Sequence, residues 1–123
     1  MTEQINPPSG GQTILERAFR VRAYECDPYG HVNHANYLRY MQESAFDASA
    51  AVGYDFERYR LLGQQWLIRE TDITYLRPLV YGDTVIVRTW VGDFRRVRSR
   101  RMYELRLAGN DEPVATGTTE WVF

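Results

Sequence analysis

The stretch Tyr24–Gly53, YECDPYGHVNHANYLRYMQESAFDASAAVG, predicts a turn followed by the one long helix of this chain. Its second half places apolar and small residues at helical spacing, so that they form one stripe along a helix. Gly53 follows directly, where helices often end with a residue at positive φ. Because small residues are frequent in the stripe, we expect the helix to lie close against a sheet. The stripe consists of Tyr37, Tyr40, Met41, Ser44, Ala45, Ala48 and Val52.

The first half of the same stretch is a turn dense in chemical groups. It holds Asp27, Gly30, His31 and His34 just before or at the start of the helix, and Asn33 is an N-cap by type and place. A helix start presents N–H groups without intrahelical partners, together with the positive end of the helix dipole. The sequence therefore predicts a site that favours a bound or developing negative charge.

The rest of the chain reads as strands separated by short turns. Short turns imply antiparallel pairing, and one helix on such a sheet is a two-layer α+β domain. We predict a flexible tail over residues 1–12, a single domain over 13–123 and a connector with a short helical turn over 54–63. The predicted strands are Leu15–Tyr24, Gln65–Arg77, Thr84–Val91, Arg95–Ala108 and Val114–Phe123, with turns at Tyr81-Gly82-Asp83, Gly92-Asp93 and Gly109-Asn110-Asp111.

Composition narrows the class of protein. The chain has 123 residues, of which 44% are hydrophobic, and this suits one domain with a real core. A net charge of −1 gives no overall attraction to nucleic acid or to an anionic membrane. The single cysteine, Cys26, excludes an internal disulfide. The first residues lack the features of a signal peptide, and no apolar run could span a bilayer, so we expect a cytoplasmic protein.

The motif Asp27-Pro28-Tyr29-Gly30-His31-Val32-Asn33-His34, followed by Tyr37 and the helix, resembles the opening of the 4-hydroxybenzoyl-CoA thioesterase-like group of hotdog-fold acyl-CoA thioesterases. The resemblance covers residues 15–123 and includes Tyr75-Leu76-Arg77-Pro78 before Tyr81-Gly82-Asp83. It implies the hotdog fold, a long central helix wrapped by a five-stranded antiparallel sheet. It also implies dimers joined edge to edge with active sites at the interface, so we expect a homodimer or homotetramer.

The resemblance further implies that the chain hydrolyses an acyl-CoA thioester to a free acid and coenzyme A. Asp27 is then the catalytic carboxylate, either as general base or as nucleophile, and the backbone N–H of His34 polarises the carbonyl. A thiol has a pKa of roughly 8.5, so a thiolate leaves with little protonation, and no metal or bound cofactor is expected. Gly30 and Tyr37 are candidate substrate contacts. The alternative for Gly30 is a turn glycine, and for Tyr37 a core aromatic residue is an equally good interpretation.

A run of arginines offers a second candidate site. Arg96, Arg98 and Arg100 would share one face of the predicted strand over Arg95–Ala108. We hold two interpretations level: a cradle for the phosphates of coenzyme A, and a solvated strand that resists aggregation.

Other interpretations of the turn stay open. Asp27 before a proline is ordinary Asx-turn chemistry, and Asp27, His31 and His34 also form a weak metal-ligand pattern. Some hotdog thioesterases carry the carboxylate on the helix instead, where Glu43 and Asp47 lie. A non-catalytic acyl-CoA-binding module and a hotdog dehydratase are the alternative functions, but the paired Asp/His motif of the dehydratase is not visible. The chain contains no G-x-S-x-G, P-loop or G-x-G-x-x-G motif.

Overall fold

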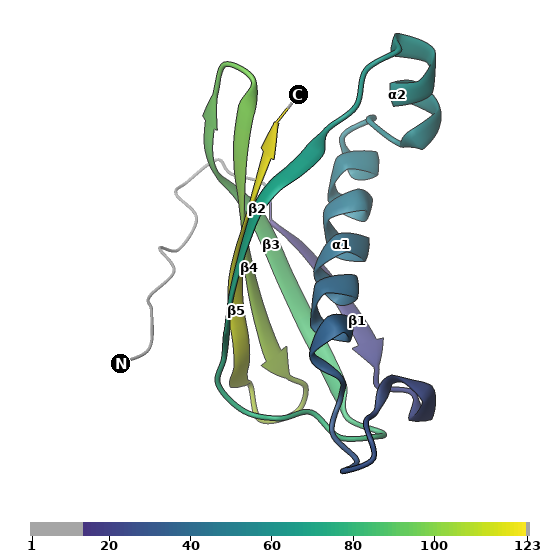
Figure 1. The fold of residues 1–123 in the computed structure, drawn as a ribbon, viewed down its shortest axis with the longest axis vertical. Coiled ribbons are helices and arrows are strands. Elements are labelled where there is room, and N and C mark those ends of the chain that lie inside the picture. The colour runs from purple at the N-terminus through teal and green to yellow at the C-terminus, as the bar shows by residue number, and fades with distance from the viewer. Residues whose placement is uncertain (1–13, 123) are drawn as a thin grey trace.

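Helix α1 (His34–Ala51) lies across one face of a five-stranded antiparallel sheet (Figure 1). The computed structural model describes residues 14–122, so the predicted tail at 1–12 lies outside the described residues. Two short helices, η1 (Ala23–Glu25) and α2 (Phe56–Leu62), flank α1 in sequence. The strands are β1 (Leu15–Arg20), β2 (Leu67–Tyr75), β3 (Thr84–Arg95), β4 (Arg98–Leu107) and β5 (Glu112–Val122). The predicted α+β hotdog architecture is confirmed.

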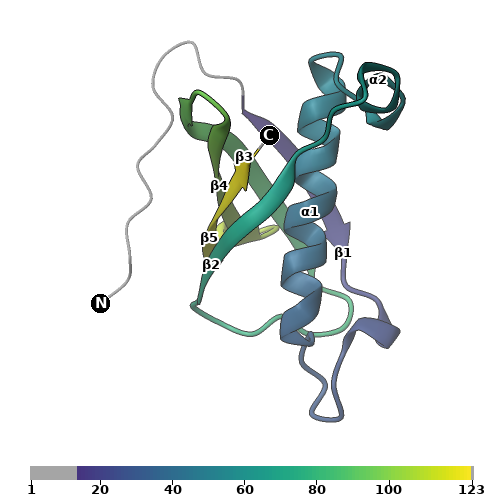
Figure 2. The ribbon, with the colours of Figure 1, turned by 45° about the horizontal axis from the view of Figure 1, so that its top comes forward.

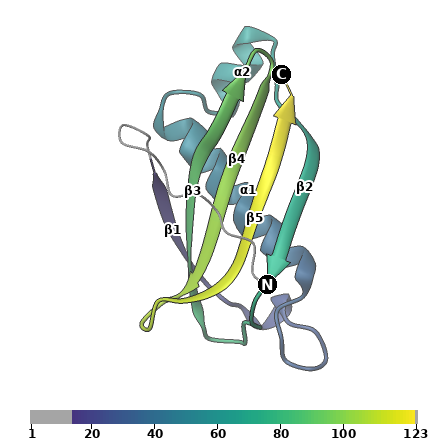
Figure 3. The same cartoon turned by 90° about the vertical axis from the view of Figure 1, so that its left-hand side faces the viewer.

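The sheet has the strand order β1-β3-β4-β5-β2, and every neighbouring pair is antiparallel. Strands β1 and β2 are therefore its two edges. Figure 2 shows the sheet curving around α1, and Figure 3 shows β3, β4 and β5 on the side away from the helix. Among residues 14–122, no helix is long and apolar enough to cross a membrane.

The core lies between α1 and the sheet. Five members of the predicted stripe, from Tyr37 to Ala45, are buried there, whereas Val52 caps the helix and is 60% exposed. Gly117 on β5 lets the two layers approach closely, because a Cβ at this position would come within 2.8 Å of Met41 Cε. The sheet contributes Val85, Val87, Tyr103, Leu105, Val114 and Ala115 to the same cluster.

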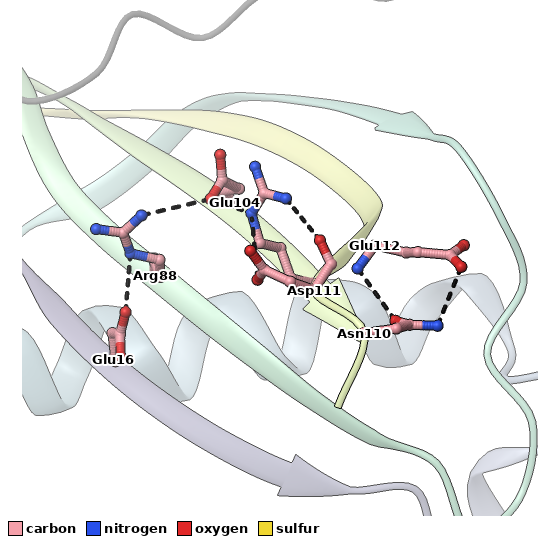
Figure 4. Close-up of polar contacts among 7 residues, drawn as sticks. Glu16, Arg88, Glu104, Asn110, Asp111 and Glu112 are labelled. Atoms are coloured by element: carbon pink, nitrogen blue, oxygen red, sulfur yellow. Dashed lines mark hydrogen bonds and ion pairs between the residues drawn. The ribbon is translucent and has the colours of Figure 1, made fainter. Parts of the chain in front are cut away.

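The opposite face of the sheet carries a group of charged side chains in contact with one another (Figure 4). Side chains alternate along a strand, so Arg88 and Glu104 point away from α1 while their neighbours Val87 and Leu105 point toward it. Arg88 Nε lies 2.9 Å from Glu16 Oε2, and Arg106 Nε lies 2.7 Å from Glu104 Oε1. This face is therefore compatible with water in a single chain.

The predicted turn at Gly92-Asp93 was wrong. Strand β3 continues to Arg95, with a register shift between Val91 and Asp93, and the chain turns at residues 96–97 instead. Gly92 marks a close contact, since a Cβ there would meet the side chain of Met102 at 2.8 Å. Arg96 therefore lies in the turn, with a φ of 51°, and not in β4.

The predicted first strand was too long at its C-terminal end. Strand β1 stops at Arg20, and residues 23–25 form η1. The reason is local: Glu25 N–H donates to the carbonyl oxygen of Arg22, and the Glu25 carboxylate accepts from the N–H of Arg22. The predicted helical turn in the connector is confirmed as α2, which Asp55 caps at its start and Gly63 ends in the left-handed conformation.

Candidate active site

The loop between η1 and α1 carries Asp27 and closes on itself. The N–H of Asp27 donates to the carbonyl oxygen of His31 at 2.7 Å, and the N–H of Gly30 donates to the carbonyl oxygen of Asp27 at 2.9 Å. Gly30 has a φ of 83°, which the turn requires and which glycine adopts without strain. The predicted turn chemistry is confirmed.

The carboxylate of Asp27 is held by the backbone of this loop. Its Oδ1 accepts hydrogen bonds from the N–H of Tyr29 at 2.9 Å and from the N–H of His31 at 3.1 Å. Within residues 14–122, Oδ2 makes no hydrogen bond. One carboxylate oxygen is thus fixed in direction, while the other remains open to a water molecule or a substrate.

Helix α1 begins at His34, six residues after the loop's proline. Asn33 is extended and accepts a hydrogen bond from the N–H of Ala35 at 2.9 Å through Oδ1, which confirms it as the N-cap. The N–H of His34 has no hydrogen-bond partner among the described residues, and its imidazole is exposed. The helix start therefore offers one free donor at the position predicted for carbonyl polarisation.

A second set of contacts fastens the loop to the helix. The carbonyl oxygen of Glu25 accepts from the N–H of Asn33 at 2.8 Å and from Asn36 Nδ2 at 2.9 Å. Glu25 Oε1 accepts from the hydroxyl of Tyr40 at 2.9 Å. Neither Glu25 nor Asn36 was predicted to have a role in the site, and Tyr40 was predicted only as part of the helix stripe. The only signal was the spacing of four between Asn36 and Tyr40, which places both on one side of α1.

Tyr37 lies in the core directly beneath the site. It is 4% exposed, and its hydroxyl accepts a hydrogen bond from the N–H of Leu79 at 3.2 Å. Burial raises the pKa of the Tyr37 hydroxyl above its usual range. Its ring meets that of Tyr75 edge-on at 5.0 Å, and the Tyr75 hydroxyl lies 3.5 Å from the carbonyl oxygen of His34. The C-terminal end of β2 is therefore next to the start of α1.

The alternative catalytic groups are placed differently. Among residues 14–122, no three His, Cys, Asp or Glu side chains come together as metal ligands, so the geometry lends no support to a metal held by Asp27, His31 and His34. Asp47 on α1 forms an ion pair with Arg17 of β1 at 2.9 Å. Glu43 is exposed on the same helix.

The predicted arginine site lies at the other end of the domain. Arg98 and Arg100 alternate with helix-facing residues and so point away from α1, and Arg100 Nη2 lies 3.8 Å from Glu120 Oε2. Arg98 shares a row across the sheet with Leu67, at the end of β2 opposite Tyr75. Eight residues along β2 and two strand spacings separate Arg98 from Tyr75 by about 28 Å. One chain therefore does not bring these arginines to Asp27.

Comparisons with known proteins identify the family of the chain. Residues 21–123 match the family model of the thioesterase-like superfamily. A Bacillus subtilis protein provisionally named acyl-CoA thioesterase YneP is 28% identical over 92 residues, which span 75% of this chain and 67% of that protein. The Arabidopsis thaliana acyl-acyl carrier protein thioesterase ATL2 is 30% identical over 109 residues, which span 87% of this chain and 58% of that protein.

A solved structure shows the same fold. The DHNA-CoA thioesterase of Staphylococcus aureus superposes with a TM-score of 0.82 at 25% identity, over 89% of this chain and 72% of that one. The family match covers most of the chain and includes Asp27, the start of α1 and all strands from β2 onward. The chain therefore belongs to the thioesterase-like superfamily of hotdog-fold thioester hydrolases.

Proposed function

We propose that this chain hydrolyses acyl-CoA thioesters to a free acid and coenzyme A, with Asp27 as the catalytic carboxylate. The observation that carries the proposal is the state of that side chain. Two backbone N–H groups hold Oδ1, and Oδ2 is left without a partner among the described residues, in the loop that leads into α1. The relatives' names supply the substrate class, thioesters of coenzyme A or of an acyl carrier protein.

The reaction needs little more than these groups. In one form, Asp27 accepts a proton from water as the water oxygen bonds to the thioester carbon. In the other, Asp27 attacks that carbon and forms a mixed anhydride, which water then hydrolyses. In both, the free N–H of His34 stabilises the carbonyl oxygen, the C–S bond breaks, and the thiolate leaves and takes up a proton. Water is the second reactant, so the proposed reaction requires no cofactor or metal.

Gly30 and Tyr37 are secondary parts of this proposal. Gly30 shapes the loop at positive φ, and the space where its side chain would lie is free of other atoms within 4 Å. A substrate could approach the backbone there. Tyr37 is buried, so its contribution is indirect. It packs below the site, where it accepts a hydrogen bond from Leu79 and contacts the ring of Tyr75.

We also propose that two chains pair through their β2 edges. No strand among residues 14–122 covers the outer edge of β2, and its apolar side chains Leu67, Ile68 and Tyr75 are 57%, 44% and 47% exposed. An edge of this kind invites pairing with a second copy. Sedimentation at micromolar concentration should show a dimer or tetramer, whereas an active monomer would contradict this interface.

Pairing of the two β2 edges changes the position of the arginines. In an antiparallel pair, the Leu67 end of one strand lies beside the Tyr75 end of the other. Arg98 of one chain is then about 15 Å, or three strand spacings, from Tyr75 of the other. The pantetheine arm has about 13 bonds between sulfur and phosphorus, and an extended chain of that length also spans roughly 15 Å. We propose Arg98, with Arg96 and Arg100 beside it, as a contact for coenzyme A across the dimer.

A substrate panel tests the proposed function. Purified protein should release thiol from at least one of a set of short, long, branched and aromatic acyl-CoA thioesters, and the same acyl groups on an acyl carrier protein should be assayed in parallel. Turnover of the carrier-protein thioesters alone would mean that the substrate is an acyl carrier protein thioester and not an acyl-CoA, while the proposed hydrolysis would stand. Binding of acyl-CoA without turnover of any thioester would contradict the proposal and favour a binding module.

A further inference from the structure

We infer that Asn36 and Tyr40 are positioning residues that hold the Asp27 loop in register with the start of α1. The inference rests on the proposed function, because it assigns these residues to the same site. Both lie on the first two turns of α1, and both reach Glu25, which is two residues before Asp27. Among residues 14–122, neither side chain forms a hydrogen bond with Asp27.

The amide of Asn36 is oriented by two partners. Its Nδ2 donates to the carbonyl oxygen of Glu25, and its Oδ1 accepts from Arg39 Nη1 at 2.9 Å. A guanidinium can only donate, so this second contact requires the oxygen on that side and leaves Nδ2 for Glu25. Asn36 is 4% exposed. Polar side chains buried to this degree are nearly always hydrogen-bonded, as Asn36 is here.

Tyr40 holds the other side of the same residue. Its hydroxyl donates to the carboxylate of Glu25, whose Oε1 also accepts the N–H of Arg22 at 2.8 Å. The ring is 3% exposed and stacks on Phe19 of β1 at 5.2 Å, so the hydroxyl is anchored to the core. Glu25 is therefore held through its backbone by Asn36 and through its side chain by Tyr40.

This arrangement joins the two halves of the proposed site. Asp27 supplies the reacting carboxylate from the loop, and His34 supplies the free N–H from the helix. The N–H of Asn33, next to His34, also donates to the carbonyl oxygen of Glu25. Loss of the Asn36 or Tyr40 contact would let the loop shift against the helix, and a misplacement of ~1 Å can cost about 10²-fold in rate.

Two tyrosine-to-phenylalanine variants separate positioning from plain stability. Tyr40→Phe removes the hydroxyl and keeps the ring, and Glu25 Oε1 retains the N–H of Arg22. Tyr103→Phe is the matched control: its hydroxyl is also buried, 2.8 Å from Thr119 Oγ1, and that oxygen retains the indole N–H of Trp121. Both variants lose a tyrosine hydroxyl that forms a hydrogen bond, but the Tyr103 bond joins β4 to β5 and does not involve the Asp27 loop.

We expect Tyr40→Phe to lower kcat about 10-fold, and Asn36→Ala to lower kcat further. KM should stay within about twofold in both variants, because both leave the substrate contacts in place. Tyr103→Phe should lower the melting temperature by about as much as Tyr40→Phe does, and it should leave kcat within about twofold of wild type. Hydrogen exchange at the N–H of Asn33 should speed up in Tyr40→Phe alone. Equal kcat values for Tyr40→Phe and Tyr103→Phe would overturn the inference, whereas a wild-type protein without turnover would overturn the proposed function instead.

Discussion

The hydroxyl of Tyr40, on the buried side of α1, donates a hydrogen bond to Oε1 of Glu25 at 2.9 Å, two residues before Asp27. Fifteen positions separate the two residues in sequence. Their contact shows that the loop that carries the Asp27 carboxylate is fastened to the rest of the domain. It is tied to the same helix whose start offers the free N–H of His34.

The Tyr40 contact predicts a dependence of stability on alkaline pH. Burial, and next the hydrogen bond to Glu25, raise the pKa of Tyr40 above its ordinary value of 10.0, so folding favours the neutral phenol. Stability from a group whose pKa rises on folding is complete below its unfolded pKa and is lost as the pH rises above it. Tyr40→Phe should therefore cost about 1 kcal/mol near neutral pH, and this difference should shrink above pH ~10.

Urea denaturation of both proteins across this range measures the difference. Tyr37 and Tyr103 also have raised pKa values, but they occur in both proteins and cancel from the comparison. A difference that stays constant well above pH 10 would mean that the Tyr40 hydroxyl is not held as described.

Local patterns made the helix and the turn predictable. The spacing from Tyr37 to Ala45 and the short turn from Asp27 to Gly30 depend on residues close together in sequence, and the structure confirms both. The glycine at position 92 was misinterpreted because its reason is nonlocal. It accommodates Met102 on the next strand, ten residues away, and not a change of chain direction.

The wrong turn at Gly92-Asp93 also misplaced the arginines in the predicted strand. With the turn at residues 96–97, Arg96 leaves the strand, and the distance from Arg98 to Asp27 depends on rows across three strands. The hydrogen bond from Asn36 to Glu25 likewise joins residues eleven positions apart, and its acceptor is a backbone carbonyl oxygen. No pattern of side-chain types in one sequence reveals such a contact.

Gly30→Ala should impair catalysis through the backbone alone. An alanine Cβ at Gly30 meets no atom within 4 Å, but the φ of 83° strains any other residue by roughly 1–2 kcal/mol. We expect a lower melting temperature and a lower kcat, since relief of the strain moves the Asp27 loop.

Gly63→Ala is the matched control for this variant. Gly63 has a φ of 67° and the same free space, but it ends α2 at the opposite end of the domain from the Asp27 loop (Figure 1). The melting temperature of Gly63→Ala should fall as in Gly30→Ala, while kcat stays within about twofold of wild type. A similar loss of kcat in both variants would show that strain acts through general stability and not through the loop.

Arg98→Glu tests the contact across the dimer. The variant should raise KM for an acyl-CoA far more than for the corresponding acyl-pantetheine, which lacks the nucleotide. At acyl-CoA concentrations well below the raised KM, mixing Arg98→Glu chains with Asp27→Asn chains should restore activity above that of either parent, to about a quarter of wild type. In a symmetric dimer, one site of each mixed pair combines the intact Asp27 of one chain with the intact Arg98 of the other. No gain on mixing after subunit exchange would contradict the proposed role of Arg98.

The proposed catalytic role of Asp27 predicts a large loss of kcat in Asp27→Asn, measured on the best substrate of the panel. The substitution removes the negative charge but keeps the size of the side chain and an oxygen that can accept from Tyr29 and His31. A positioned base contributes about 10²–10⁴-fold in rate, so kcat should fall by at least ~10²-fold with KM changed little. Glu43→Gln and Asp47→Asn, on α1, should cost much less. An Asp27→Asn protein that folds like wild type and keeps kcat within about threefold would contradict the account and point to Glu43 or Asp47.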